Sequence, residues 1–438
     1  MRKACAAVVG VFAVTVAAGE TAGEQKPAQP QAQQAQVQVP KLPPGVSEAL
    51  YRISVPPERA PTPERVALGD KLFNDKRLSV DNTVSCATCH DPKKGFVDGK
   101  VKSDGVAKGQ RTGRNSPTVL NAMFNAAQFW DGRAATLEDQ AKLPITNPIE
   151  MGMKDGDAVV ARLRGIPAYR DEFQKVFGRD IHFDDVAAAI SAFERTQFSG
   201  NAPFDRFITG ETDAISPSAR RGWALFNGKG RCMSCHQGNA VQPLFSDQKF
   251  HNIGIAAHQQ DFPKLAREAL GIVRAGDEKQ IDELAIQTRF TELGRFLVTR
   301  SENEIGAFKT PTLRNIGLTA PYMHDGSLAT LWDVMDHYNK GGVPNPFLDG
   351  GMQRLGLTEP EIDDLVELMF ALTDQRFADF GKSEKARQTK LKSKRPERDT
   401  ATAMAKKGHV GDLAPNPDKK NPAELGIFGA YSNIGASK

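Results

Sequence analysis

The chain has 438 residues, a formal net charge of +4 and 39% hydrophobic residues. This near balance of charge is not typical of a nucleic-acid-binding protein, so we expect no nucleic-acid partner. The 39 glycines and 27 prolines exceed the usual combined share of about 12%, and only 7% of residues are aromatic, so we expect many loops.

The N-terminus has the pattern of a secretory signal. Arg2 and Lys3 precede an apolar stretch over residues 4–18, which ends in the small residues of a cleavage site. The stretch is too short to span a membrane. We therefore predict a signal peptide over residues 1–23 and a periplasmic protein without a membrane span. Residues 24–45 are rich in Gln, Pro and Ala, which predicts a disordered linker.

Two pentapeptides, residues 86–90 and 232–236, read Cys-x-x-Cys-His, the pattern for covalent attachment of c-type haem. The two thiols form thioethers to the porphyrin, and the histidine ligates the iron. Zinc is the alternative, because Cys-x-x-Cys also opens zinc sites, but no second cysteine pair follows nearby. We therefore expect two haem c groups, held by Cys86, Cys89 and His90 and by Cys232, Cys235 and His236.

One haem motif lies in each half of the remaining chain, which predicts two domains. We expect an N-terminal haem domain over residues 46–205 and a C-terminal haem domain over residues 206–380. Helical periodicity without sustained strand alternation predicts a mainly α fold, with two cytochrome c-like haem domains and extensive loops. Residues 381–438 begin with a basic run and predict a flexible tail, although docking to an acidic partner is the alternative.

Capping patterns mark several of the expected helices. Asp184 and Asp185 are cap candidates for a helix over residues 184–196. Ser216, followed by a proline, should begin another helix shortly before the second haem motif. Thr358 with Glu361 forms a capping box before a third apolar helix.

Four further segments carry a resemblance to a known family. They are residues 129–133 (Phe-Trp-Asp-Gly-Arg), 147–152 (Asn-Pro-Ile-Glu-Met-Gly), 309–315 (Lys-Thr-Pro-Thr-Leu-Arg-Asn) and 320–326 (Ala-Pro-Tyr-Met-His-Asp-Gly). In order and spacing they resemble the bacterial dihaem cytochrome c peroxidases and their relative MauG over residues 60–380. The resemblance implies a first haem that meets hydrogen peroxide and a second haem that stores or relays electrons.

The first haem of the peroxidases often carries a removable distal histidine. No histidine lies between His90 and His182 here, so we expect an open iron position that needs no reductive activation. Met123, Met151 and Met153 remain conceivable ligands, although methionines at such positions more often pack in the core.

The resemblance also implies the residues that act on peroxide. Glu150 matches the family's distal glutamate, which would move protons by general acid–base catalysis. Gln140 and Pro144 match residues that line the same pocket. Trp130 matches the tryptophan that carries charge between the two haems.

The distal ligand of the second haem separates the two branches of this family. The peroxidases have a methionine fourteen residues after the histidine that corresponds to His324, and that spacing gives Tyr338 here, as in MauG. Thr330 and the glycines at 341–342 should bound the helix that carries Tyr338. Met335, one turn earlier on the same face, is the main rival, and His337 or an open site are the others.

Asn115, Thr319 and Pro321 match the positions through which the family binds a calcium ion, the last two through backbone carbonyls. The alternative is an ordinary loop and turn without a metal. The stretch over residues 237–308 has no assigned function, and its His251 could form a hydrogen bond near the second haem.

These observations lead to one hypothesis and three rivals. The hypothesis is a MauG-like oxidoreductase that reacts with hydrogen peroxide, shares oxidising equivalents through Trp130, and oxidises a small redox protein or a protein substrate. The first rival is an ordinary cytochrome c peroxidase with cytochrome c or a cupredoxin as donor. The others are a non-enzymatic dihaem electron carrier and a redox sensor that acts through the basic tail.

Overall fold

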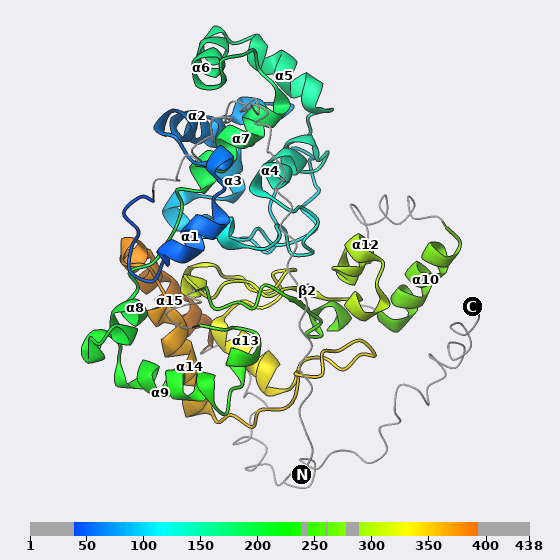
Figure 1. The fold of residues 1–438 in the computed structure, drawn as a ribbon. Coiled ribbons are helices and arrows are strands. Elements are labelled where there is room, and N and C mark those ends of the chain that lie inside the picture. Colours follow the sequence, from blue (N-terminus) through cyan, green and yellow to red (C-terminus); the bar gives the residue numbers. More distant parts are fainter. Residues whose placement is uncertain (1–38, 239–243, 259–261, 277–288, 393–438) are drawn as a thin grey trace, which may run out of the picture. The chain divides into compact units, whose positions relative to one another are not determined.

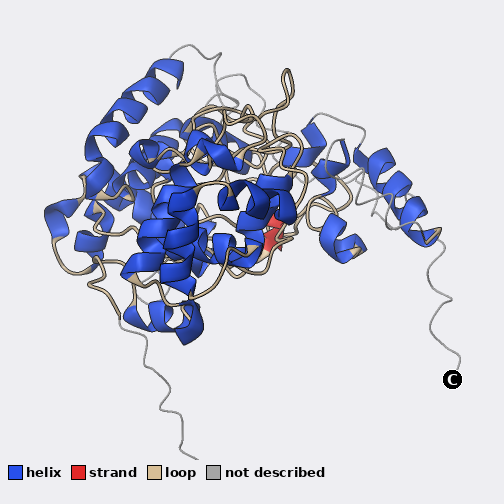
Figure 2. Ribbon diagram, turned by 90° about the horizontal axis from the view of Figure 1, so that it is seen from above, coloured by secondary structure: helices blue, strands red, loops and turns tan. Residues whose placement is uncertain are grey.

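The computed structural model describes residues 39–238, 244–258, 262–276 and 289–392, so the predicted signal peptide lies outside the described residues. The expectation of a mainly α fold is confirmed (Figure 2). The α-helices are α1 (Glu48–Ser54), α2 (Pro63–Asn74), α3 (Cys86–Cys89), α4 (Leu137–Thr146), α5 (Gly156–Arg164), α6 (Pro167–Phe177), α7 (Phe183–Glu194), α8 (Pro203–Ile208), α9 (Pro217–Asn227), α10 (Phe262–Arg274), α12 (Phe296–Thr299), α13 (Leu331–Asn339), α14 (Glu359–Ala371) and α15 (Ala378–Lys392). The strands β1 (Phe250–His251) and β2 (Phe308–Lys309) form one short antiparallel pair, with Phe250 opposite Lys309.

The first hydrophobic cluster is built on α2 and α7, which lie side by side in Figure 1. Thr62 caps α2 through its side chain, and Pro63 occupies the first helical turn. Gly69 allows the crossing, because a Cβ atom there would lie 1.9 Å from the carbonyl oxygen of Ala189 on α7. Cys86 packs against this cluster, which therefore supports the first haem motif.

The second cluster repeats this arrangement with α9 and α14. A Cβ atom on Gly222 of α9 would lie 2.1 Å from the carbonyl oxygen of Asp364 on α14. Ser216 caps α9 and Thr358 caps α14 with its capping box, so both predicted starts are confirmed. Cys232 packs against this cluster, as Cys86 does against the first.

A further cluster consists of buried residues from the described parts of the stretch between Ala256 and Phe308, with contributions from α10, α12 and the 3-10 helix Arg289–Leu293. Trp130 packs against this cluster from outside. Part of the 237–308 stretch, to which the sequence analysis assigned no function, therefore packs against Trp130, the tryptophan expected to carry charge between the haems.

The structure differs from three sequence-based expectations about boundaries and caps. Helix α8 (Pro203–Ile208) crosses the proposed cut between residues 205 and 206, because Phe204 and Asp205 are both buried. Helix α7 begins after His182 without a side-chain cap, and Asp185 instead accepts hydrogen bonds from Arg179. Because the Asp185 carboxylate pairs with Arg179, it does not cap the helix.

The described ends of the predicted linker and tail pack on the fold. Pro44 accepts a hydrogen bond from the backbone N–H of Asn201, 2.7 Å away, so the end of the predicted linker packs on the fold. Helix α15 (Ala378–Lys392) corrects the expectation of a flexible tail over residues 381–392, because its Gln388 is completely buried. No helix in the described part of the chain combines the length and apolarity needed to cross a membrane.

Candidate haem sites

Both Cys-x-x-Cys-His motifs face one cavity of about 940 Å³. Its lining includes Cys86, Cys89 and His90 from the first motif and Cys232, Cys235 and His236 from the second. Apolar side chains from both halves of the chain complete the walls, among them Ile190 and Leu365. Two motifs 146 positions apart are thus brought to a single apolar space suited to large planar cofactors.

The two motif histidines have the same environment. The Nδ1 atom of His90 donates to the carbonyl oxygen of Phe96 at 3.3 Å, and that of His236 donates to the carbonyl oxygen of Phe245 at 2.9 Å. Burial lowers the pKa of both imidazoles, which keeps them neutral. A neutral ring that donates from Nδ1 presents Nε2 as a metal ligand, so both histidines fit haem iron.

The motif cysteines are suited to thioethers rather than to a zinc site. None of the four forms a disulfide. Burial is the main cause that raises the pKa of Cys86 to about 12, of Cys89 to about 11 and of Cys232 to about 12. A closed zinc site needs four ligands, and the one metal-ligating cluster among the described residues that includes a motif cysteine has three members, Cys235, Asp247 and His251.

The residues expected to act on peroxide line the cavity that the first haem motif faces. Helix α4 supplies Gln140 and Pro144, and the loop that follows it supplies Glu150. Asn147 donates from Nδ2 to the Glu150 carboxylate at 3.2 Å. Burial raises the pKa of Glu150, and the positive charge of Arg133 opposes this shift. A carboxyl group in such a site is suited to take up and return a proton during a reaction.

The three methionines considered as ligands of the first iron have separate positions. Met123 and Met153 are buried in hydrophobic clusters, and Met151 is the one that also lines the cavity. Packing therefore accounts for Met123 and Met153.

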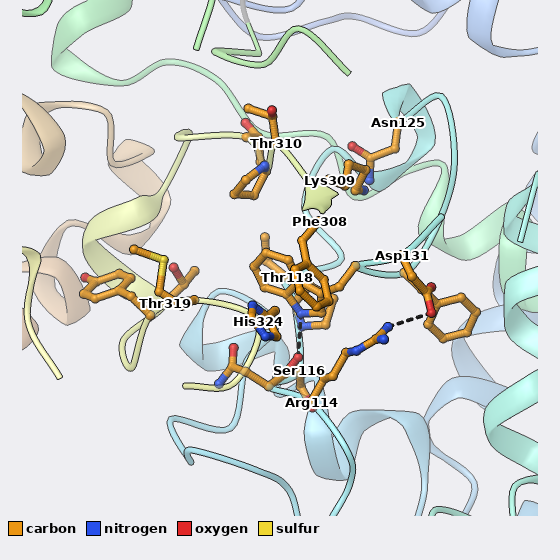
Figure 3. Close-up of a pocket in the computed structure, with 18 of the residues that line it drawn as sticks. Arg114, Ser116, Thr118, Asn125, Asp131, Phe308, Lys309, Thr310, Thr319 and His324 are labelled. Atoms are coloured by element: carbon orange, nitrogen blue, oxygen red, sulfur yellow. Dashed lines mark hydrogen bonds and ion pairs between the residues drawn. The ribbon is translucent and has the colours of Figure 1, made fainter. Parts of the chain in front are cut away.

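Trp130 lies between elements of both halves. Its indole Nε1 donates to the backbone carbonyl of Asn115 at 2.9 Å, and the backbone N–H of Asn115 donates to the carbonyl of His324 at 2.8 Å. Figure 3 shows His324 stacked on Phe308, with ring centroids 3.6 Å apart. Trp130 also lines the cavity that both motifs face.

Charged groups fix the surroundings of this stack. His324 donates from Nε2 to the carboxylate of Glu292 at 2.8 Å, and Arg114 pairs with Asp131 at 2.7 Å (Figure 3). Burial raises the pKa of Glu292, but the hydrogen bond and charge of His324, together with the charges of Arg114 and Lys102, leave this pKa lowered. Glu292 belongs to the 237–308 stretch, so that stretch supplies an anion to the region around Trp130.

Helix α13 presents the expected face to the second motif. Leu331, Val334, Met335 and Tyr338 all line the cavity, and Thr330 caps the helix with a capping box. Burial raises the pKa of Tyr338. His337 is engaged elsewhere, because its Nε2 donates to the carbonyl of Ile253 at 2.8 Å.

Comparisons with known proteins agree with this geometry. Residues 63–213 match the family model described as di-haem cytochrome c peroxidase. The methylamine utilization protein MauG of Methylorubrum extorquens is 41% identical over 313 residues, which cover 71% of this chain and 78% of that protein. The chain belongs to the dihaem cytochrome c peroxidase and MauG family. It is therefore a peroxidase-family oxidoreductase with two haem c cofactors.

Relatives from both branches of the dihaem family are similar to this chain. The cytochrome-c peroxidase IdrP1 of Denitromonas iodatirespirans is 38% identical over 83% of this chain and 92% of its own length. A solved structure of a MauG-like protein associated with microbial copper homeostasis superposes with a TM-score of 0.60 and 31% identity, over 78% of this chain and 98% of that protein. These likenesses establish the family without separating its branches.

The three residues expected to bind calcium line the same cavity. Asn115, Thr319 and Pro321 all line the cavity, although they come from segments about 200 positions apart. Asn115 donates from its side-chain Nδ2 to the carbonyl oxygen of Lys100 at 2.9 Å, which fixes its amide. Amide and carbonyl oxygens are the ligand type that calcium takes.

Two ionisable cavity residues were missed by the sequence analysis. Glu194 ends α7, and in the described part of the chain its Oε2 is buried without a hydrogen-bond partner. Burial is the main cause that raises the pKa of Glu194 to about 8, and burial lowers the pKa of Lys309 to about 8. Glu194 has no motif around it, and only the crossing of α7 with α2 and α4 brings it to the first haem site.

His251 lies beside the second motif, where the sequence analysis placed it. It pairs with Asp349 at 2.6 Å and with Asp247 at 3.0 Å. Cys235, Asp247 and His251 lie close enough to hold a metal ion. With its sulfur in the expected haem thioether, Cys235 would not be free to serve as a ligand of a separate metal.

Proposed function

We propose that this protein is a periplasmic dihaem c-type oxidoreductase of the MauG-like branch. It takes hydrogen peroxide at the N-terminal haem site and oxidises a small redox protein or a protein substrate. When bound, the two haems supply the iron centres that accept and pass on electrons. The observation that carries the branch assignment is Tyr338, which faces the cavity beside the second motif.

At the first site, Cys86 and Cys89 hold the porphyrin and His90 provides the iron ligand. The sequence has no histidine between His90 and His182, which supports an open position opposite His90. Glu150 holds and returns the proton at the peroxide oxygen, and its buried environment keeps its proton affinity high. Gln140 and Pro144 on α4 shape the space in which the peroxide is held.

At the second site, Cys232 and Cys235 hold the porphyrin and His236 provides one iron ligand. Tyr338 provides the opposite ligand. No hydrogen bond to the Tyr338 hydroxyl is present among the described residues, which leaves its oxygen available to a metal. Met335 shares the cavity and is the competing ligand, whereas the hydrogen bond from His337 to Ile253 removes His337 from competition.

Trp130 is the side chain through which the two sites share charge, and we assign calcium to Asn115, Thr319 and Pro321 beside it. The hydrogen bond from the Trp130 indole to Asn115 supports this pairing, because it links the tryptophan to the calcium segment. Removal of calcium with a chelator should therefore change the spectra of both haems, and added calcium should restore them.

The test is an optical and near-infrared titration of the diferric holo-protein with stoichiometric hydrogen peroxide. We expect a rapid spectral change at both haems without prior reduction. A response only after one haem is reduced would favour the cytochrome c peroxidase alternative, which similarity to the IdrP1 peroxidase supports. No response in any redox state would leave an electron carrier.

A pair of variants identifies the ligand on α13. Tyr338→Met should raise the reduction potential of the second haem, because a thioether favours ferrous iron more than a phenolate does. Met335→Leu is the matched control and should leave the second haem spectrum unchanged. If Met335→Leu changes the spectrum of the second haem and Tyr338→Met leaves its spectrum and reduction potential unchanged, Met335 is the ligand, and the thioether ligation is of the peroxidase type.

A further inference from the structure

Helix α15 (Ala378–Lys392) is held against the second hydrophobic cluster. Two of its basic side chains pair with α14, since Lys385 contacts Glu367 at 2.7 Å and Lys392 contacts Asp363. Lys392 also lies over the ring of Trp332 on α13. These two lysines therefore hold α15 against neighbouring helices, whereas Lys382 and Arg387 pair within α15.

Gln388 is the one polar side chain of α15 that is fully buried, with an exposed fraction of 0%. Its Oε1 accepts a hydrogen bond from the backbone N–H of Leu331 at 3.0 Å. Its Nε2 donates to the hydroxyl of Tyr322 at 3.0 Å and to the carbonyl of Gly317 at 3.4 Å. One amide group thus joins α15 to two separate segments.

Both segments are walls of the second haem site. Leu331 is the first residue of α13, the helix that carries Met335 and Tyr338. The first N–H groups of a helix have no partner within the helix, so an acceptor there holds the helix in place. Tyr322 belongs to the segment that lines the same cavity, and its hydroxyl donates to the carbonyl of Ile316 at 3.0 Å.

We infer that Gln388 is a positioning residue for the second haem, because its amide fixes the start of the ligand-bearing helix α13 against the segment that contains Tyr322. This inference deepens the proposed function and rests on it only in placing the distal ligand on α13. It applies whether Tyr338 or Met335 is that ligand. Helix α15 is therefore part of the second haem site although none of its residues lines the cavity.

The test uses the full-length holo-protein and the variant Gln388→Met, which keeps the size of the side chain and removes its hydrogen bonds. We expect several-fold faster hydrogen exchange at the Leu331 amide, and a changed spectrum and reduction potential of the second haem alone. Gln388→Glu retains an acceptor for the Leu331 N–H and should restore much of the exchange protection.

Ser218→Ala is the matched control. It removes the hydrogen bond from Ser218 on α9 to Asp364 on α14, the two helices on which the second cluster is built. If both variants lower the melting temperature and only Gln388→Met changes the second haem, the inference stands. If Gln388→Met resembles Ser218→Ala and leaves the second haem spectrum and potential unchanged, the inference is wrong.

Truncation gives an independent measurement. A chain that ends at Lys392 retains α15 and should keep the wild-type spectrum of the second haem, whereas a chain that ends at Phe377 should lose it. Suppose that Tyr338→Met leaves the spectrum and potential of the second haem unchanged, whereas Gln388→Met alters them. Tyr338 is then not the ligand, and the role of Gln388 stands. An unaltered second haem after removal of α15 would overturn that role.

Discussion

The indole of Trp130 donates a hydrogen bond to the backbone carbonyl of Asn115, 2.9 Å away. The same residue, Asn115, donates from its own backbone N–H to His324. The predicted charge carrier is therefore fixed by the segment assigned to calcium, and its orientation depends on that segment. A substitution of Trp130 that removes the indole N–H therefore also removes this contact.

Trp130→Phe should uncouple the two haems. Phenylalanine cannot donate to Asn115 and is harder to oxidise than an indole, and the orphaned carbonyl costs about 1–3 kcal/mol of stability. The near-infrared and redox signals of electron sharing between the haems should disappear, while each haem keeps its own absorption. Undiminished sharing in this variant would eliminate Trp130 as the route.

Glu150→Gln should slow the reaction of the diferric protein with hydrogen peroxide. Glutamine keeps the size of the side chain but cannot take up the proton, and such groups contribute about 10²–10⁴-fold in rate. Stopped-flow absorption measures this step directly. The exposed Glu64→Gln is the control and should react at the wild-type rate, and an equal rate in both variants would refute the role of Glu150.

Glu194 should make the stability of the protein depend on pH. Its pKa is raised to about 8, so the unfolded chain loses this proton near its ordinary pKa of 4.5 while the folded chain still holds it. The stabilisation that this group provides is complete below about pH 4.5 and is lost as the pH rises to about 8, with a slope of up to about 1.4 kcal/mol per pH unit.

Glu194→Gln should abolish this component, as measured by urea unfolding of the holo-protein at pH 5 and pH 8. Glu138→Gln is the control of opposite sign. Burial raises the pKa of Glu138, but its hydrogen bonds and the charges of Arg195 and Arg59 together leave this pKa lowered, so its contribution is lost as the pH falls. Parallel pH curves for wild type and Glu194→Gln would contradict the prediction.

Gly69→Ala should destabilise the first haem domain by roughly 2–4 kcal/mol, because the added Cβ would clash with the Ala189 carbonyl at the crossing of α2 and α7. Gly271→Ala on α10 is the control, since nothing lies within 4 Å of its Cβ position. That substitution should stabilise α10 by about 0.5–1 kcal/mol. Calorimetry distinguishes the two, and equal melting temperatures would show that the crossing tolerates a methyl group.

The sequence by itself determined the features that depend on neighbouring residues. A haem motif needs two cysteines and a histidine within five positions, so residues 86–90 and 232–236 were readable directly. Helix starts at Ser216, Thr330 and Thr358 were predictable for the same reason, because a cap bonds to groups two or three residues away.

Only the tertiary structure decided which distant groups meet. Glu194 reaches the first haem site because α7 crosses α2, and the supposed tail buries Gln388 beside α13. His337 turns to the carbonyl of Ile253, a contact across 84 positions that no local pattern encodes. Such contacts depend on packing between elements far apart in the chain, and helical periodicity specifies a face but not its partner.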